Sequence, residues 1–455
     1  MTERADGQAE GHRKDIEHPG APEYPGSTDP RVARDRDPRS PADGTGGAGR
    51  VAPGLPEGTH QPRELRWAEE PCGCGAHDDS VSRAAERDRA PSAHPAPKRP
   101  SDEAHPLGAK RHWPRSFADR LTDPLPGVRA FARLAREGAM RPSATSLRAE
   151  LSELPYAPAP LPQVDARALA IGWAGHASWV LRIGGLTVLT DPVWSRRILG
   201  TPVRITPVGF VWEDLPTIDA VVLSHNHYDH LDAPTLRRLP RATPLFVPAG
   251  LGGWCRKRGF TTVTELDWWE GAELPAAEGA AGLGERPRVR FDFVPAHHWS
   301  KRTLTDTCRS LWGGWVLTAP DGRRVYFAGD TGYGHFFREI GEAFPGIDLG
   351  LLPIGAYDPR WMLRPVHTDP EEAVQACLDV GARRMAPMHW ATFLLSAEPP
   401  LEPLRRVRAA WRAAGLDRDD LWDLPVGASR VLEPAGAVHG TPDGGRGQGS
   451  SGPGR

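Results

Sequence analysis

The stretch Ile218–Asp232, IDAVVLSHNHYDHLD, decides how the rest of the chain is interpreted. It opens with an apolar run that has the composition of a buried strand and continues into the pattern H-x-H-x-D-H. Residues two apart on an extended chain project to the same side, so His225 and His227 can converge on one metal ion. Asp229 and His230, past the turn, can reach a second ion nearby. Imidazole and carboxylate groups suit zinc and other divalent first-row metals.

Three downstream segments each place a further potential ligand after an apolar run. FVPAHHW carries His297 and His298, VYFAGDTGY carries Asp330, and MAPMHWATF carries His389. Asp330 ends an expected strand and precedes Thr-Gly, where a carboxylate can stand clear of the backbone and bridge two cations. Together with the H-x-H-x-D-H motif, these residues predict two ligand sets that share one bridging carboxylate. The residues alone leave His297 and His298 as alternatives.

The composition changes along the 455 residues, which include 50 Gly and 48 Pro. Residues 1–110 contain two aromatic side chains and too few aliphatic ones to offset the entropy of ordering. We therefore expect a disordered Pro/Gly/Arg-rich arm over residues 1–110 and a leader over 111–165 with a helical segment that packs on the core. A folded domain over 166–435 and a flexible tail over 436–455 complete the expected organisation.

Charge, cysteine content and hydropathy exclude several classes of protein. A formal net charge of −2, from 56 basic and 58 acidic residues, disfavours a nucleic-acid-binding protein that relies on bulk positive charge. Five scattered cysteines do not form a disulfide framework. No apolar run reaches the ~18 residues of a membrane span, and the first residues lack the apolar region of a secretion signal. We expect a cytoplasmic protein, with peripheral contact with a membrane left open.

The part of the chain that is expected to fold mixes short β-branched runs with helical stretches. Helices are predicted over Asp369–Val380 and Pro403–Ala414, with Asp369 as an N-cap and Pro370 at the first helical position. Strands interleaved with helices over ~270 residues predict one α/β domain whose sheets are covered by helices.

The order of the potential ligands resembles that of the metallo-β-lactamase superfamily, whose fold is an αββα sandwich with a dinuclear metal site at one edge. Longer segments resemble the N-acyl-phosphatidylethanolamine phospholipase D family. They include GHASWVL, LTDPVWSRR, LSHNHYDHLD, PAHHWSKRTLTD, FAGDTGY, HTDPEEAV and HWATF. The resemblance runs from about Gly172 to His389 and continues more weakly to about Leu432. It has no counterpart in residues 1–110.

The resemblance implies a role for each matching residue. In the family, the third histidine of the first metal directly precedes a Trp, which selects His298 over His297. The implied ligands are then His225, His227 and His298 for the first ion, Asp229, His230 and His389 for the second, and Asp330 as the bridge. The implied cofactor is two divalent ions per chain, with zinc the foremost choice.

Further residues are expected near this site. Asp191 in LTDP resembles an aspartate that supports the metal-binding loop by hydrogen bonds. His367 is a candidate for contacting phosphate or assisting the leaving group. The catalytic candidates are His367 and the two carboxylates of Asp229 and Asp330. The remaining candidates could support the site or contact the substrate, and each has a purely structural role as its alternative: His176, Tyr228, Lys301 and Arg302.

The activity that the resemblance implies is hydrolysis of a phosphodiester. Water activated by two metal ions would attack the phosphorus of a phospholipid, release an N-acylethanolamine and leave phosphatidic acid. One alternative is a metal-dependent hydrolase of a small phosphorylated compound or a lactone, and another is a non-catalytic interaction protein. The expected partner is a phospholipid or another phosphodiester, not a nucleic acid, and a homodimer is left open.

Overall fold

The computed structural model describes residues 101–138, 141–276 and 287–432. These residues belong to one compact unit that is built around two seven-stranded sheets. The tail that we expect over 436–455, and the expected arm as far as residue 100, lie outside the described residues. Among the residues that the structure describes, no helix is long and apolar enough to cross a membrane.

The first sheet combines antiparallel and parallel strands. Strands β8, β9, β10 and β11 form antiparallel pairs with one another. In contrast, β1 joins β8 in parallel, and β11, β12 and β13 run parallel to one another. In spatial order the strands are β1 (Ala104–His105), β8 (Glu270–Pro275), β9 (Arg288–Val294), β10 (Gly314–Thr318), β11 (Arg324–Phe327), β12 (Leu349–Pro353) and β13 (Met385–Met388).

The second sheet has the same mixed character. Strands β14, β2, β3 and β4 form antiparallel pairs, and β4 to β7 form parallel pairs. In spatial order the strands are β14 (Ser429–Leu432), β2 (Leu169–Gly175), β3 (Ser178–Ile183), β4 (Leu186–Thr190), β5 (Ala220–Val222), β6 (Leu245–Pro248) and β7 (Val263–Leu266).

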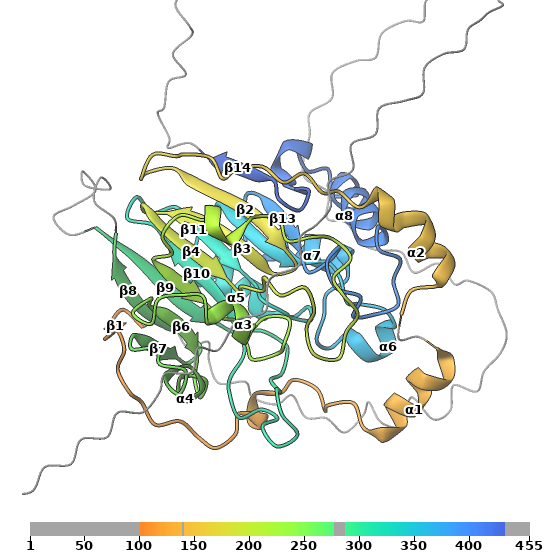
Figure 1. The fold of residues 1–455 in the computed structure, drawn as a ribbon, viewed down its shortest axis with the longest axis horizontal. Coiled ribbons are helices and arrows are strands. Elements are labelled where there is room, and N and C mark those ends of the chain that lie inside the picture. Colours follow the sequence, from red (N-terminus) through yellow and green to blue (C-terminus); the bar gives the residue numbers. More distant parts are fainter. Residues whose placement is uncertain (1–100, 139–140, 277–286, 433–455) are drawn as a thin grey trace, which may run out of the picture. The chain divides into compact units, whose positions relative to one another are not determined.

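The larger apolar cluster joins the two sheets, and a second one packs the other face of the second sheet against α3 (Ala233–Leu236) and α4 (Gly252–Arg256). Helices cover the outer faces of the sheets (Figure 1). Phe246 of β6 stacks on Phe291 of β9 with ring centroids 4.1 Å apart, which joins one sheet to the other. Trp315 of β10 donates its indole N–H to the carbonyl oxygen of Leu223 at 2.9 Å, so its buried polar atom is satisfied at the end of β5. This arrangement confirms the predicted αββα sandwich.

The helices begin and end close to where the sequence signals predict. Asp369 caps α7 in a reciprocal capping box with Glu372, and Pro370 occupies the first helical position. The predicted Pro403–Ala414 helix forms as α8. The helices are α1 (Val128–Glu137), α2 (Ala144–Glu150), α3 (Ala233–Leu236), α4 (Gly252–Arg256), α5 (Phe336–Ala343), α6 (Arg360–Leu363), α7 (Pro370–Asp379) and α8 (Glu402–Ala413).

Residues 101–110, which we expected to belong to a disordered arm, begin with a segment that joins the first sheet. Ala104 of β1 pairs with Gly271 of β8, and Ser101 donates its backbone N–H to the Trp269 carbonyl oxygen at 2.9 Å. Backbone hydrogen bonds hold this edge strand, and they are available to almost any residue. The low apolar content of the segment therefore does not reveal its place in the sheet.

The leader over 111–165 contains the two short helices α1 and α2 where one helical segment was expected (Figure 1). Glu150 of α2 accepts hydrogen bonds from the Leu401 backbone N–H at 2.8 Å and from Arg405 of α8 at 2.6 Å. Glu137 of α1 accepts one from the Trp361 indole N–H at 3.1 Å. Both helices of the leader are thus tied to the domain by specific polar contacts.

The potential ligands follow the C-terminal ends of strands, where parallel strands bring their ends to one edge of a sheet. β5 leads to His225, β11 to Asp330 and β13 to His389. The ends of β5 and β11 approach closely at Gly329, where a Cβ atom would lie 2.6 Å from the Cβ of Ser224. The backbone φ of 63° at Gly329 also favours glycine, so this residue permits the two sheets to meet beside Asp330.

Candidate metal centre

Three histidines that follow β5 and β9 form a first set of potential ligands, called the first ligand set below. The Nε2 atom of His225 lies 2.9 Å from Nδ1 of His227, and Nε2 of His298 lies 3.2 Å from the same Nδ1. The imidazoles of His225 and His298 are almost entirely buried. The structure therefore brings together the three residues that were predicted for the first ion.

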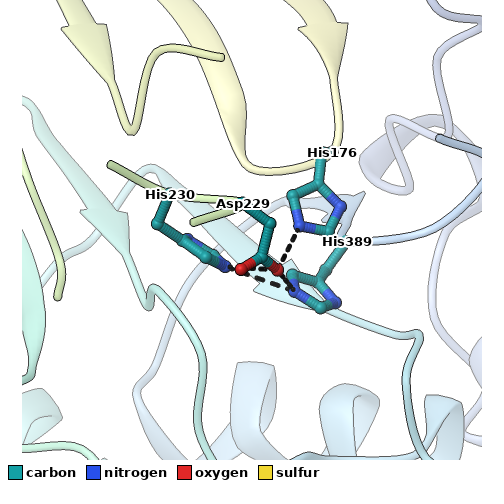
Figure 2. A group of neighbouring side chains, drawn as sticks. All are labelled: His176, Asp229, His230 and His389. Atoms are coloured by element: carbon teal, nitrogen blue, oxygen red, sulfur yellow. Dashed lines mark hydrogen bonds and ion pairs between the residues drawn. The ribbon is translucent and has the colours of Figure 1, made fainter. Parts of the chain in front are cut away.

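A second group of ligand atoms lies next to the first and is shown in Figure 2. It contains Asp229, His230 and His389, the three residues predicted for the second ion, and also His176. The Oδ2 atom of Asp229 is 3.4 Å from Nε2 of His230 and 3.6 Å from Nε2 of His389. The ligand atoms of the group all lie within 4.8 Å of one another.

The carboxylate of Asp330 stands between the two sets. Its Oδ2 atom is 3.8 Å from Nε2 of His298 and 3.0 Å from Nε2 of His230. Its Oδ1 atom is 3.0 Å from Nε2 of His389. A single buried carboxylate that faces imidazoles of both sets has the position that a bridging ligand requires.

His298, and not its neighbour His297, faces the cluster. The Nδ1 atom of His298 lies 3.1 Å from the Val366 carbonyl oxygen, which leaves Nε2 directed toward His227. The ring of His297 instead packs against Phe336 with centroids 4.6 Å apart. Adjacent residues of an extended segment point to opposite sides, and this alternation separates the two histidines.

Asp191 and Ser224 orient two of the potential ligands through hydrogen bonds. Nδ1 of His230 lies 2.6 Å from Oδ2 of Asp191, and the Ser224 backbone N–H donates to Oδ1 of Asp191 at 2.7 Å. The Ser224 hydroxyl also contacts Nδ1 of His225 at 2.9 Å. Contacts of this kind fix which ring nitrogen of a ligand faces the metal. Ser224 was not singled out from the sequence, although its place directly before the first histidine is a signal that could have found it.

Burial and neighbouring carboxylates together determine the charge of the histidines. It lowers the pKa of His225 and His298 well below the ordinary value and that of His227 to about 4, so these imidazoles are neutral at pH 7. For His389, burial is outweighed by the carboxylates of Asp330 and Asp229, which raise the pKa to about 9. Neutral imidazole is the form that binds a metal, so the proton on His389 must leave when a cation binds there.

The donor set fits divalent metal ions. A tetrahedral zinc ion with Zn–N bonds of about 2.0–2.1 Å holds its nitrogen ligands about 3.3 Å apart. The 2.9 Å and 3.2 Å separations in the first set are close to that spacing. Imidazole nitrogens and carboxylate oxygens converge without a lysine or an arginine among them, which is the chemistry that borderline cations prefer.

A cavity of about 370 Å³ opens directly onto the two ligand sets. Its floor includes His227, Asp229, His298, Asp330 and His389. Its walls are largely apolar and come from the leader and from the region of α6. The wall residues include Leu121, Pro124, Leu125, Pro126, Phe131, Met362, Leu363, Pro365, Val366 and Leu395. The contribution of the leader was not predicted, because no local pattern shows which surface a proline-containing segment will cover.

The remaining candidates separate into two kinds. Lys301 and His367 line the cavity, and Lys301 is the one basic side chain among the described residues that line it. Arg302 instead donates to the backbone carbonyl oxygens of Asn226 at 3.1 Å and Leu231 at 2.7 Å, where it ties down the loop that carries the H-x-H-x-D-H motif.

Tyr228 does not line the cavity. Its ring lies under the Arg302 guanidinium, with the carbon of the guanidinium 4.1 Å from the ring centroid, and packs near a small apolar cluster with Val193 and Phe393. The structure therefore places Arg302 and Tyr228 in support of the motif loop, while Lys301 remains a candidate for contact with an anionic group.

Comparisons with known proteins agree with this architecture. Residues 187–390 match the family model described as a beta-lactamase superfamily domain. The chain is 39% identical to an uncharacterized protein of Mycobacterium tuberculosis over 289 residues, which cover 61% of this chain and 71% of that protein. It is 37% identical to the N-acyl-phosphatidylethanolamine-hydrolyzing phospholipase D 1 of Caenorhabditis elegans over 265 residues, which cover 55% of this chain and 71% of the relative.

Two further comparisons cover about half of the chain. A mitochondrial N-acyl-phosphatidylethanolamine-hydrolyzing phospholipase D of Saccharomyces cerevisiae is 36% identical over 249 residues, which cover 52% of this chain and 51% of the relative. Among solved structures, a metallo hydrolase from the archaeon Ignicoccus hospitalis aligns with 58% of this chain and 99% of its own, with 24% identity and a TM-score of 0.42.

Proposed function

Because the chain belongs to the N-acyl-phosphatidylethanolamine phospholipase D family of the metallo-β-lactamase superfamily and is a metal-dependent hydrolase, we propose that it hydrolyses the phosphodiester bond of an N-acylated phospholipid. The observation that carries this choice of substrate is the apolar cavity that opens onto both ligand sets. The products would be an N-acylethanolamine and phosphatidic acid. Membership of this family of enzymes argues against the alternative of a non-catalytic interaction protein.

The proposed ligands are the seven residues of the two ligand sets, five of which line the floor of the cavity. His225, His227 and His298 would hold the first ion, Asp229, His230 and His389 the second, and Asp330 both. When bound, two divalent cations supply Lewis acidity to a phosphoryl oxygen and lower the pKa of an attacking water toward neutrality. Zinc fits the imidazole-rich first set best.

The cavity walls bind and orient the rest of the substrate. Leu125 and Phe131 of the leader line the apolar walls together with Met362 and Leu363, where acyl chains would exchange water for hydrocarbon contacts. The ammonium group of Lys301 is available to an anionic oxygen of the headgroup. A substrate with a charged phosphodiester and long apolar chains uses both parts of this surface.

His367 would move the proton that the reaction requires. Its ring lies 5.2 Å from the ring of His298 and 5.4 Å from that of His389, and it lines the cavity. Its Nδ1 atom has no hydrogen-bond partner among the described residues. Burial lowers the pKa of His367 to about 4, so its imidazole is neutral at pH 7. It would accept the proton that the attacking water loses and pass it to the ethanolamine oxygen as the bond between that oxygen and phosphorus breaks.

The test compares the lipid with a phosphodiester that shares its reacting bond but lacks its apolar part, and with a lactone, which represents the alternative reaction. Purified protein loaded with zinc is incubated with N-acyl-phosphatidylethanolamine in detergent micelles, with a water-soluble phosphodiester and with a lactone. We expect the lipid to have the highest kcat/KM by at least ten-fold, because only the lipid has acyl chains that can contact the apolar walls of the cavity. Equal or faster turnover of the soluble phosphodiester or the lactone would contradict the proposed substrate and favour the alternative of a small-molecule hydrolase.

A further inference from the structure

His176 lies in the turn between β2 and β3 and belongs to the same group of side chains as Asp229, His230 and His389 (Figure 2). Its Nε2 atom lies 3.0 Å from Oδ2 of Asp229, and its ring is about 1% exposed. Its ring centroid lies 4.0 Å from that of His389. The proposed ligand sets do not use this buried, polar side chain.

The chemistry of the contact assigns the proton. An ionised carboxylate only accepts hydrogen bonds, so Nε2 of His176 is the donor and Oδ2 of Asp229 the acceptor. The same Oδ2 atom is the oxygen of Asp229 that lies near Nε2 of both His230 and His389. The His176 N–H therefore holds the oxygen that faces the second ligand set.

The backbone of His176 is fixed from both sheets. Its N–H donates to the Thr392 hydroxyl at 2.7 Å, and its carbonyl oxygen accepts from the Trp173 indole at 2.9 Å and from the His389 backbone N–H at 3.2 Å. It also holds a backbone φ of 55°, which a residue with a side chain adopts at a cost. A turn held this firmly can set the position of the imidazole relative to Asp229 and His389.

We propose that His176 is a positioning residue that directs the Asp229 carboxylate toward the second metal ion. This inference rests on the metal centre assigned under the proposed function. His176 is not itself a ligand in this account, because a proton occupies the nitrogen that faces the cluster. The second set is also complete without it, since His230, His389, Asp229 and the shared Asp330 make four ligands.

Isosteric variants separate this role from simple packing. The amide nitrogen of Gln can reach the position of Nε2, whereas Asn is one methylene shorter and reaches only the position of Nδ1. We would prepare His176→Gln, His176→Asn and His176→Phe, with His297→Gln as a matched control outside the cluster. Each metal-free protein would be titrated with Zn²⁺ in the presence of a competing chromophoric chelator, after its fold has been checked by circular dichroism.

The expected result is a selective effect on one ion. Wild type, His176→Gln and His297→Gln bind two zinc ions, while His176→Asn and His176→Phe keep the first and bind the second 10- to 100-fold more weakly. Two results would overturn the role: wild-type affinity for both ions in His176→Asn, or a loss in His176→Gln as large as in His176→Asn. The Gln and Asn pair decides the question even if His176→Phe does not fold. A wild-type protein that binds no second ion would overturn the metal centre on which the role depends.

Discussion

Nδ1 of His230 lies 2.6 Å from Oδ2 of Asp191, and this contact determines which nitrogen of His230 faces the other candidate ligands. Because the carboxylate of Asp191 accepts a hydrogen bond from the N–H at Nδ1 of His230, Nε2 is left toward His389 and Asp330. Asp191 follows β4 and His230 follows β5, two parallel neighbours in one sheet. The strand pairing itself therefore sets the orientation of a ligand.

Replacing Asp191 with Asn should weaken metal binding without removing a ligand. The amide group would present N–H atoms where Asp191 now accepts hydrogen bonds from Ser224 and His230, so His230 would lose its fixed orientation. We expect zinc affinity at the second ion to fall 10- to 100-fold in a chelator competition titration. Asp219→Asn is the control, because Asp219 accepts from the Thr187 backbone N–H at the other end of the strands. Unchanged affinity in Asp191→Asn would show that the contact does not orient the ligand.

His298→Ala should lose the first ion, whereas His297→Ala should keep it. Removing His298 deletes one of three imidazoles that converge within 3.2 Å of a neighbour, so zinc content should fall by one ion and turnover at least 100-fold. Removing His297 deletes a side chain that packs against Phe336, and both zinc ions should remain. Elemental analysis and turnover decide the matter. A metal-poor His297→Ala beside a fully loaded His298→Ala would reverse the assignment.

Met362→Ala should impair turnover of lipid more than turnover of a soluble phosphodiester. Met362 lines the apolar wall of the cavity, and losing about 1.4 kcal/mol of contact with an acyl chain corresponds to a ten-fold loss of kcat/KM. Leu304→Ala is the matched control, since Leu304 is 93% exposed and does not line the cavity. Equal losses for the lipid and for the soluble substrate would mean that Met362 does not contact the acyl chain.

Asp292 should make stability fall as pH rises through the mildly acidic range. Burial raises the pKa of Asp292 to about 6, although the Arg290 guanidinium opposes this shift. Between pH 4 and 6 the folded protein then holds a proton that the unfolded chain has released, so the free energy of unfolding decreases with increasing pH. The decrease is up to about 3 kcal/mol and ends above pH 6.

The measurement is denaturant unfolding of wild type and Asp292→Asn at several pH values. Asn cannot titrate, and the metal ligands are the same in both proteins, so the difference between the two curves isolates Asp292. Stability of wild type relative to the variant should decline from pH 4 to 6 and then level off. A difference that stays constant across this range would show that the pKa of Asp292 is not raised by burial.

Much of the fold and of the ligand set could be predicted because the signals are local. The H-x-H-x-D-H motif, Asp330 and His389 each follow an apolar run, and a strand end is a position that sequence reveals. The capping residue Asp369 is equally local. In contrast, residues 121–131 form a wall of the cavity because of where the leader crosses the domain. The sequence of the leader does not show which part of the domain it will cover.

Two other features depended on contacts between distant segments. Arg302 and Lys301 are neighbours of similar charge, yet one binds the backbone of the motif loop and the other lines the cavity. Only the packing of the loop around Tyr228 separates them. The edge strand at Ala104 is held by backbone hydrogen bonds, which the amino-acid composition of the segment does not reveal.

The most direct test of the account follows the oxygen atom that enters the product. Zinc-loaded protein would be incubated with N-acyl-phosphatidylethanolamine in water enriched in oxygen-18, and both products would be analysed by mass spectrometry. The account predicts one labelled oxygen in phosphatidic acid and none in the N-acylethanolamine, because water attacks phosphorus and the bond from phosphorus to the ethanolamine oxygen breaks. Label in the N-acylethanolamine, or no hydrolysis of the lipid by protein with two bound ions, would contradict it.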